Sequence, residues 1–361
     1  MRELILNSGA LKHNLEQIKT LQPGSKILAM LKADAYGHGL EWVAEQLKEE
    51  SVSGFAVADL IEAHRLKKLN LNLPIVLMSG VTNLTDLKTV IDEGYELVIH
   101  HEIHISLLEQ LNTNKKIKLW IKIDSGMHRL GFSPEAMKEI GRRLLSLTCI
   151  AQPVVLITHF SDANEINQLT TAKQIMLFHL VCDQFPKSIE YVCSLANSAG
   201  ILSRLVPTVA WIRPGIILYG VSPFLEQNRI KKNLQAVMTV RSKIISINKY
   251  SAGAAIGYGG TYICPSDKKI AVVAFGYGDG YPWSAKNSQV LIKGRLFYVV
   301  GRISMDMLQV DLNDAEDIKV GDSVTLWGEG LPVENLAKSA GTIPYEITCR
   351  MPRHRMKIIF L

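Results

Sequence analysis

Five short apolar runs in the first two thirds of the chain end on, or lead into, polar side chains that could do chemistry: Lys32, Lys122, His159, Asn197 and Arg213. A lysine in a low-dielectric site has a lowered pKa, and its neutral amine can act as a nucleophile or as a base. A buried arginine needs a specific acceptor, because an unpaired buried guanidinium is very costly in free energy. If the ends of these runs meet, they would form a cationic site centred on Lys32.

Taken one at a time, these residues have simpler explanations. Lys32 could be a solvated residue at the boundary of a strand, and His159 could be a hydrogen-bonded histidine of the core. The surroundings of Lys32 favour a chemical role, because a glycine-rich polar loop follows it and the chain has no P-loop and no serine or cysteine nucleophile motif. We therefore expect Lys32 to be the reactive group.

The apolar runs predict eight buried parallel strands, because each is short, rich in β-branched residues and almost continuously apolar. They span Lys26–Leu31, Gly54–Ala58, Pro74–Met78, Glu96–Ile99, Ile117–Ile123, Pro153–Thr158, Ile189–Cys193 and Val209–Ile212. Amphipathic segments between them predict helices at Leu40–Glu50, Asp59–Leu69, Asn83–Gly94, Pro134–Leu147 and Glu165–Phe185. Eight strand–helix units indicate a (β/α)8 barrel, and the G-x-G-x-x-G fingerprint of an open doubly wound sheet is missing after the first strand. The carboxyl ends of barrel strands form one mouth, which would bring the five polar residues together.

The pattern changes after about Phe224. Strand-like runs then predominate, at Val237–Ile247, Ile270–Phe275, Gln289–Ile292, Phe297–Val300, Leu308–Val310 and Val324–Trp327. One helix is expected at Pro332–Ala340. We therefore predict two domains, an α/β barrel over residues 1–224 and a mostly β domain over residues 225–361.

The composition is typical of a folded globular protein. Hydrophobic residues make up 47% of the 361 residues, and 40 Lys+Arg against 34 Asp+Glu give a net charge of +6. The two signs are interspersed, which argues against nucleic acid as a partner. The densest basic run, Arg350–Lys357, we interpret as the solvated face of a last strand.

Localisation and metal binding follow from what the sequence lacks. No apolar run approaches the roughly 18 residues of a membrane span, and the N-terminus lacks the apolar core of a signal peptide. The five cysteines form no C-x-x-C motif, so we expect a reducing, cytoplasmic location. His100, His101 and His104 have helical spacing without the H-E-x-x-H order, so we expect an exposed helix start and no metal ion.

The sequence Lys32-Ala-Asp-Ala-Tyr-Gly-His-Gly closely resembles the cofactor-lysine motif of the alanine racemases, enzymes that use pyridoxal 5'-phosphate (PLP) to interconvert L- and D-alanine. Further motifs follow in the family's order over nearly the whole chain: Asp124-Ser-Gly-Met-His-Arg-Leu-Gly, Thr158-His-Phe, Ala196-Asn-Ser, Arg213-Pro-Gly, Gly257-Tyr-Gly-Gly-Thr-Tyr, Gly276-Tyr-Gly-Asp-Gly-Tyr, Gly301-Arg-Ile-Ser-Met-Asp and Pro344-Tyr-Glu. One departure is the opening Arg2–Ser8, which is short and lacks the acidic strand-like start usual in the family.

The resemblance implies a racemase with two bases. Lys32 would bind PLP as a Schiff base and act on one face of the substrate α-carbon, and Tyr258 of a second subunit would act on the opposite face. Arg213 would face the pyridine nitrogen, with His159 hydrogen-bonded to Arg213 and with Asn197 in the cofactor site. The phosphate would be held by Tyr36, Ser198, Gly215, Ile216 and Tyr345. The protein would then be a head-to-tail homodimer with shared active sites that supplies D-alanine for peptidoglycan.

The resemblance also implies the substrate contacts. Arg129 would contact the phenolic oxygen of the cofactor or the substrate carboxylate, and Met305, beside Asp306, would reach that carboxylate from the second subunit through its backbone. Lys122 matches a lysine that is often carbamylated in the family, with an ordinary ion-paired lysine as the alternative. Tyr277 would line the entryway to the site.

Three other functions stay open on the sequence. A broad-specificity racemase would share these motifs, and the width of the pocket near Tyr345 and Met305 would decide between the two. A basic amino-acid decarboxylase is expected to place an acid near the ring nitrogen, where this chain offers Arg213. A non-catalytic PLP-binding protein would be a single domain and would leave the second domain without a role.

Overall fold

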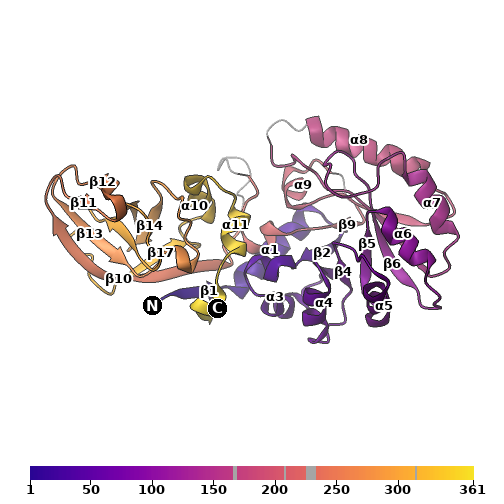
Figure 1. The fold of residues 1–361 in the computed structure, drawn as a ribbon, viewed down its shortest axis with the longest axis horizontal. Coiled ribbons are helices and arrows are strands. Elements are labelled where there is room, and N and C mark those ends of the chain that lie inside the picture. Colours follow the sequence, from indigo (N-terminus) through magenta and orange to yellow (C-terminus); the bar gives the residue numbers. More distant parts are fainter. Residues whose placement is uncertain (166–168, 207–208, 225–232, 314) are drawn as a thin grey trace.

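Eight parallel strands form the first sheet of the protein (Figure 1). The computed structural model describes residues 1–165, 169–206, 209–224, 233–313 and 315–361. In sheet order the strands are β8 (Tyr191–Ser194), β7 (Ile150–Ile157), β6 (Ile117–Lys122), β5 (Glu96–Ile99), β4 (Ile75–Leu77), β3 (Gly54–Val57), β2 (Lys26–Met30) and β9 (Trp211–Ile212). The sheet closes between β8 and β9, because the Arg213 N–H donates to the Ala196 carbonyl at 2.9 Å and Asn197 forms a parallel bridge with Arg213. The predicted (β/α)8 barrel is therefore confirmed.

Helices follow the strands around the barrel. They are α1 (Ser8–Leu21), α2 (Lys32–Tyr36), α3 (Leu40–Leu47), α4 (Leu60–Lys67), α5 (Leu84–Glu93), α6 (Glu102–Glu109), α7 (Met137–Leu145), α8 (Leu169–Gln184) and α9 (Ser198–Ser203). Residues 166–168 of the helix expected at 165–185 lie outside the described residues. Side-chain oxygens of Asn7, Asp59 and Asn83 accept backbone N–H groups at the starts of α1, α4 and α5, which is why these helices begin where they do.

The histidine cluster differs from the expected exposed helix start. His101 caps α6 by accepting the Ile103 N–H at 3.2 Å, but His104 is only 2% exposed. Its Nδ1 accepts the backbone N–H groups of His100 and His101, each at 3.2 Å. Burial lowers the pKa of His104 to about 4, so this ring is neutral and serves the helix cap.

A second sheet of eight strands makes up most of the C-terminal domain. In order its strands are β13 (Lys268–Val273), β16 (Leu308–Asp311), β15 (Arg295–Val300), β14 (Gln289–Ile292), β17 (Ser323–Trp327), β10 (Met238–Tyr250), β1 (Glu3–Leu6) and β18 (Lys357–Phe360). A hairpin of β11 (Ala255–Ile256) and β12 (Tyr262–Ile263), with helices α10 (Val333–Ala340) and α11 (Pro344–Cys349), completes it. The mostly β character expected for this region is confirmed.

The two ends of the chain meet in the second sheet. The opening segment that lacks the family's usual start forms β1, which pairs antiparallel with β10 and parallel with β18. The assignment of residues 1–224 to the barrel therefore does not hold for Glu3–Leu6, because a four-residue run gives little sequence signal. The boundary predicted at 224 adjoins residues 225–232, which lie outside the described residues. No helix in the described ranges is both long and apolar enough to cross a membrane.

A buried carboxylate ties both chain ends to the second domain. Asp279 is fully buried, and its oxygens lie 2.8 Å from Arg2 Nε and 3.1 Å from Arg355 Nε. The same arginines pair with Asp306, at 3.2 Å for Arg2 and 2.6 Å for Arg355. The basic run 350–357 is therefore not simply the solvated face of a strand, since Arg353 and Arg355 are both held in ion pairs.

We expect Asp279→Ala to lower the free energy of unfolding by about 2–4 kcal/mol, because it leaves two arginines without their buried partner. The loss of stability should be smaller than the loss from breaking a fully buried ion pair, because Arg2 and Arg355 keep partial access to water. Urea denaturation measures it, with Asp317→Ala as the control, since the Asp317–Arg295 pair is exposed. An equal loss in both variants would contradict this account of Asp279.

Candidate active site

The carboxyl ends of the barrel strands bring together the cations singled out in the sequence. Lys32 follows β2, Lys122 ends β6, Arg213 follows β9, and Arg129 stands in the loop after β6. Burial lowers the pKa of Lys32, and Arg129 and Arg213 lower it further. Burial, Arg129 and Arg213 likewise lower the pKa of Lys122 to about 8. These side chains therefore share one electrostatic environment, as the predicted barrel mouth requires.

The cations of this cluster lack ion-pair partners among the described residues. Among the described residues, no carboxylate forms an ion pair with Lys32, Lys122 or Arg129. Lys122 is only 8% exposed and has no ion-pair partner among the described residues, which argues against the alternative of an ordinary ion-paired lysine. Burial, and then Arg213 and Lys122, hold the pKa of His159 well below its usual value, so that ring is neutral. An anion entering this mouth would be strongly favoured.

Arg213 is held by main-chain oxygens. Its side chain is 3% exposed. Nη1 donates to the Ser194 carbonyl and to Ser194 Oγ, both at 2.7 Å, and Nη2 donates to Thr158 O at 2.5 Å and Leu195 O at 3.3 Å. These bonds use four of the five guanidinium N–H groups. Nε makes no hydrogen bond to any described residue, so one donor of this side chain is left for a ligand.

The expected hydrogen bond from His159 to Arg213 is not formed between these described residues. His159 Nε2 instead lies 3.4 Å from Asn197 Nδ2. The Asn197 Oδ1 accepts the Gly200 N–H at 2.9 Å and so caps α9. The main-chain carbonyls of Thr158, Ser194 and Leu195, at the ends of β7 and β8, bind the Arg213 guanidinium in place of His159.

A second group of predicted residues meets where β9 ends. Ser198 Oγ accepts the Gly215 N–H at 2.9 Å. A Cβ added to Gly215 would lie 2.4 Å from the Tyr36 hydroxyl, so only glycine fits there. The rings of Tyr36 and Tyr345 are 6.0 Å apart between centroids, and Ile216 follows Gly215 directly. The Tyr36 hydroxyl makes no hydrogen bond within the described ranges, which leaves it for a ligand.

Most of α2, from Ala33 to Tyr36, is a left-handed turn and not a regular α-helix. Ala33, Asp34, Ala35 and Tyr36 have φ between 53° and 55°. Each such L-residue costs roughly 1–2 kcal/mol, so four in succession need strong outside contacts. Those contacts come from residues that were not expected in the site, and they include ion pairs of Asp34 with Arg65 and Arg353. Asp34 lies inside the lysine motif, but its distant partner Arg353 gave no local signal.

Tyr258 lies outside this mouth. It belongs to the 3₁₀ turn at Tyr258–Gly260 between β11 and β12, at the end of the second domain away from the barrel (Figure 1). Its side chain is 69% exposed, and Met305 and Tyr277 are 55% and 44% exposed. The Gly278 N–H donates to the Met305 carbonyl at 2.9 Å, so the loops of Tyr277 and Met305 touch. Within one chain, Tyr258 and Lys32 therefore belong to opposite parts of the molecule.

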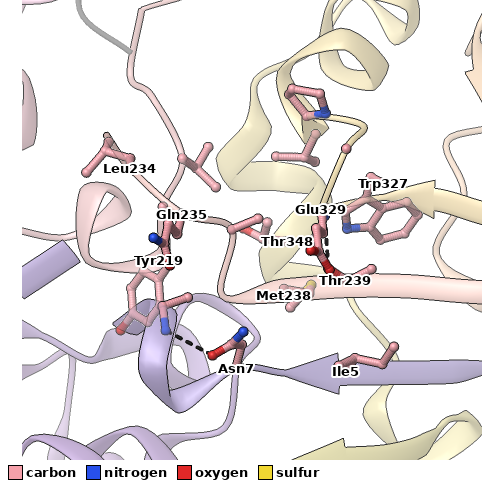
Figure 2. A pocket seen from close by; sticks show the side chains of 18 of the residues that line it. Ile5, Asn7, Tyr219, Leu234, Gln235, Met238, Thr239, Trp327, Glu329 and Thr348 are labelled. Atoms are coloured by element: carbon pink, nitrogen blue, oxygen red, sulfur yellow. Dashed lines mark hydrogen bonds between the residues drawn. The ribbon is translucent and has the colours of Figure 1, made fainter. Parts of the chain in front are cut away.

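A cavity of about 320 Å³ lies at the junction of the two domains (Figure 2). Asn7, Tyr219 and Gln235 line it from the barrel side, and Thr239 and Trp327 line it from the second sheet. In Figure 2, Asn7 accepts the Ala10 N–H at 2.9 Å and Thr239 accepts the Glu329 N–H at 2.9 Å. The lining lacks every site residue selected above, so this cavity is separate from the mouth of the barrel.

Comparison with known proteins decides the family. The alanine racemase N-terminal domain model matches residues 6–223 and the alanine racemase C-terminal domain model matches residues 237–360. The chain belongs to the alanine racemase family. An alanine racemase of Coxiella burnetii (strain RSA 493 / Nine Mile phase I) is 43% identical over 354 residues, covering 96% of this chain and 95% of the relative.

Solved structures of alanine racemases have the same fold. The crystal structure of biosynthetic alanine racemase from Pseudomonas aeruginosa gives a TM-score of 0.93 at 34% identity, covering 100% of this chain and 99% of that one. The crystal structure of alanine racemase from Bartonella henselae holds covalently bound pyridoxal phosphate. It gives a TM-score of 0.89 at 26% identity, covering 100% of this chain and 99% of that one. Members of this PLP-dependent family are isomerases.

We expect Lys122→Met to remove part of the pH dependence of stability in cofactor-free protein. The folded-state pKa of about 8 lies below that of an unfolded lysine, so unfolded chains bind more protons between the two values and stability rises with pH in that window. Between pH 7 and pH 9 the rise should be smaller in the variant by about 1 kcal/mol. Urea denaturation in buffer purged of carbon dioxide measures it, and equal rises would contradict the unpaired state of Lys122.

Proposed function

We propose that this protein is a PLP-dependent alanine racemase that interconverts L- and D-alanine in a homodimer with shared active sites. The observation that carries the proposal is the unpaired positive charge of Lys32, Lys122 and Arg129 at the mouth of the barrel, with the free Nε–H of Arg213 beside it. The cytoplasm is its expected location, supported by five free cysteines. Its product would serve peptidoglycan synthesis, in line with the biosynthetic relative.

The residues of the mouth fit PLP. Lys32 would bind it covalently, and Tyr36, Ser198, Gly215, Ile216 and Tyr345 would hold its phosphate. Two observations support this fit: a side chain at position 215 would collide with the Tyr36 hydroxyl, and that hydroxyl has no hydrogen-bond partner among the described residues. Arg213 would offer its Nε–H to the ring nitrogen, near Asn197 and His159. When bound, PLP supplies an electron-withdrawing ring that makes the α-hydrogen of the amino acid acidic.

The residues of this chain then move the proton. The lowered pKa of Lys32 gives a neutral amine near physiological pH more readily than an ordinary lysine, so its Nζ can take or return the α-proton on one face. Tyr258 of a second copy would serve the other face through its hydroxyl. Arg213 keeps its protons, because a guanidinium cannot be deprotonated under these conditions, and it therefore donates a hydrogen bond without protonating the acceptor.

The substrate carboxylate would be held from both copies. Arg129 would face it from the barrel mouth, and the backbone of Met305, in the loop that Asp306 anchors, would reach it from the second copy. Tyr277 would line the entryway, since its loop contacts that of Met305. The exposure of Tyr258, Met305 and Tyr277 supports their being covered by another copy.

Other functions fit less well. A decarboxylase needs an acid where Arg213 stands. A non-catalytic PLP-binding protein would not need the second domain that carries Tyr258 and Met305. A broad-specificity racemase remains the second candidate, and comparing turnover of alanine, serine and lysine separates it from an alanine racemase.

Mixing two inactive variants tests the shared sites. We expect Lys32→Ala and Tyr258→Phe each to lose racemisation of L-alanine, and their mixture to recover up to about a quarter of the parent activity. Random exchange makes half the dimers mixed, and each mixed dimer has one intact site of two. Differently tagged subunits confirm that mixed dimers form. Absence of recovery in proven mixed dimers would contradict the shared site.

Carbamylation of Lys122 has its own test. Its buried amine, with a pKa of about 8, is partly neutral at neutral pH and can add carbon dioxide with release of a proton. The resulting anion would pair with Arg129. We expect a carbamate signal by carbon-13 NMR in labelled bicarbonate, and its loss in Lys122→Met. A signal of equal intensity in the variant, or none in the parent, would contradict carbamylation.

A further inference from the structure

The left-handed turn that follows Lys32 is held mainly through the carboxylate of Asp34. Oδ1 accepts the Leu40 N–H at 3.1 Å and an N–H of Arg65 at 2.7 Å. Oδ2 accepts an N–H of Arg353 at 2.9 Å. The Asp34 side chain thus links the turn to the start of α3, to α4 and to the C-terminal segment.

The backbone of Asp34 is held as well. Its N–H donates to Glu62 Oε1 at 3.1 Å, and Glu62 Oε2 accepts the Ala58 N–H at 2.9 Å. These bonds link the turn to the end of β3, the strand beside the one that carries Lys32. The turn has little freedom while both groups of Asp34 are bound.

Arg353 comes from the other end of the chain. It lies in the 3₁₀ turn Arg353–Arg355 after α11, and its side chain is 24% exposed. A Cβ added to Gly39 would lie 2.4 Å from its guanidinium, and one added to Gly37 would lie 1.9 Å from the Thr348 carbonyl. The C-terminal segment therefore packs tightly on the glycines of the lysine motif.

The charge of Asp34 agrees with this arrangement. Burial alone would raise the pKa of its carboxyl, but the Leu40 N–H, Arg65 and Arg353 outweigh burial, so the pKa is lower than usual. The carboxylate is therefore ionised at neutral pH and binds both arginines.

We propose that Arg353 and Asp34 are positioning residues for Lys32. The ion pair between them fixes the left-handed turn, and through it the C-terminal segment sets where the Lys32 amine stands in the barrel mouth. The inference rests on the proposed function, because it takes Lys32 as the residue that binds PLP. Neither residue needs to touch cofactor or substrate.

The test compares Arg353→Gln with Arg143→Gln in cofactor-free protein. Arg143 is a matched control, because its side chain is 20% exposed and bridges Glu102 and Glu109 on the barrel surface. Each variant is titrated with PLP by fluorescence, reduced with borohydride, and analysed by peptide mass spectrometry for the adduct on Lys32. Thermal midpoints without PLP report the structural loss.

We expect Arg353→Gln to weaken PLP binding about tenfold, because Lys32 loses its fixed position. Arg353→Lys should recover most of the affinity, since its ammonium can still donate to Asp34. Arg143→Gln should lower the thermal midpoint by a similar amount and bind PLP as the parent does. If Arg353→Gln does not fold, Asp34→Asn replaces it, since its amide oxygen still accepts the Leu40 N–H, and it should also bind PLP more weakly than Arg143→Gln.

Two results would overturn the inference: PLP affinity of the Arg353 and Asp34 variants equal to that of the parent, or an equal weakening in Arg143→Gln. Failure of the proposed function looks different. In that case the parent itself would form no adduct on Lys32 after reduction.

Discussion

Positive charge without ion-pair partners gathers at the mouth of the barrel, and the surrounding elements hold it there. Arg129 and Arg213 lower the pKa values of Lys32 and Lys122, and all four cations lower the pKa of His159. Lys32, Lys122 and Arg129 form no ion pair within the described ranges. Like charges in a partly buried site destabilise the empty protein, and an anionic ligand reverses that cost. The phosphate, phenolate and carboxylate groups of PLP and of an amino acid are such ligands.

Hydrogen bonds and ion pairs from the surrounding elements hold Arg213 and the turn after Lys32 in one conformation. Carbonyls at the ends of β7 and β8 fix Arg213 and leave one N–H free. Four residues in a left-handed turn follow Lys32, and contacts from α4 and from the C-terminal segment keep them there. The second domain thus has two roles in our account, since it braces the lysine of its own chain and presents Tyr258 to another copy.

Much of this was predictable from local patterns. The eight apolar runs predicted the barrel strands because both faces of such strands are buried, and the lysine motif predicted the centre of the site. The strand Glu3–Leu6 was missed because four residues give no periodicity, and its partners β10 and β18 are more than 200 residues away. The roles of Arg353 and Arg355 were missed because a basic run looks the same whether solvated or paired. Ala33 and Ala35 gave no sign of a left-handed turn, since tertiary contacts rather than glycine hold it.

We propose that the cationic mouth around Lys32 makes this chain a PLP-dependent racemase of alanine. The most direct test follows the circular dichroism of L-alanine with cofactor-free protein, before and after addition of PLP. We expect the signal to decay to zero only with PLP, and not to decay with Lys32→Ala. Equal decay with Lys32→Ala, or decay by the parent without PLP, would contradict it.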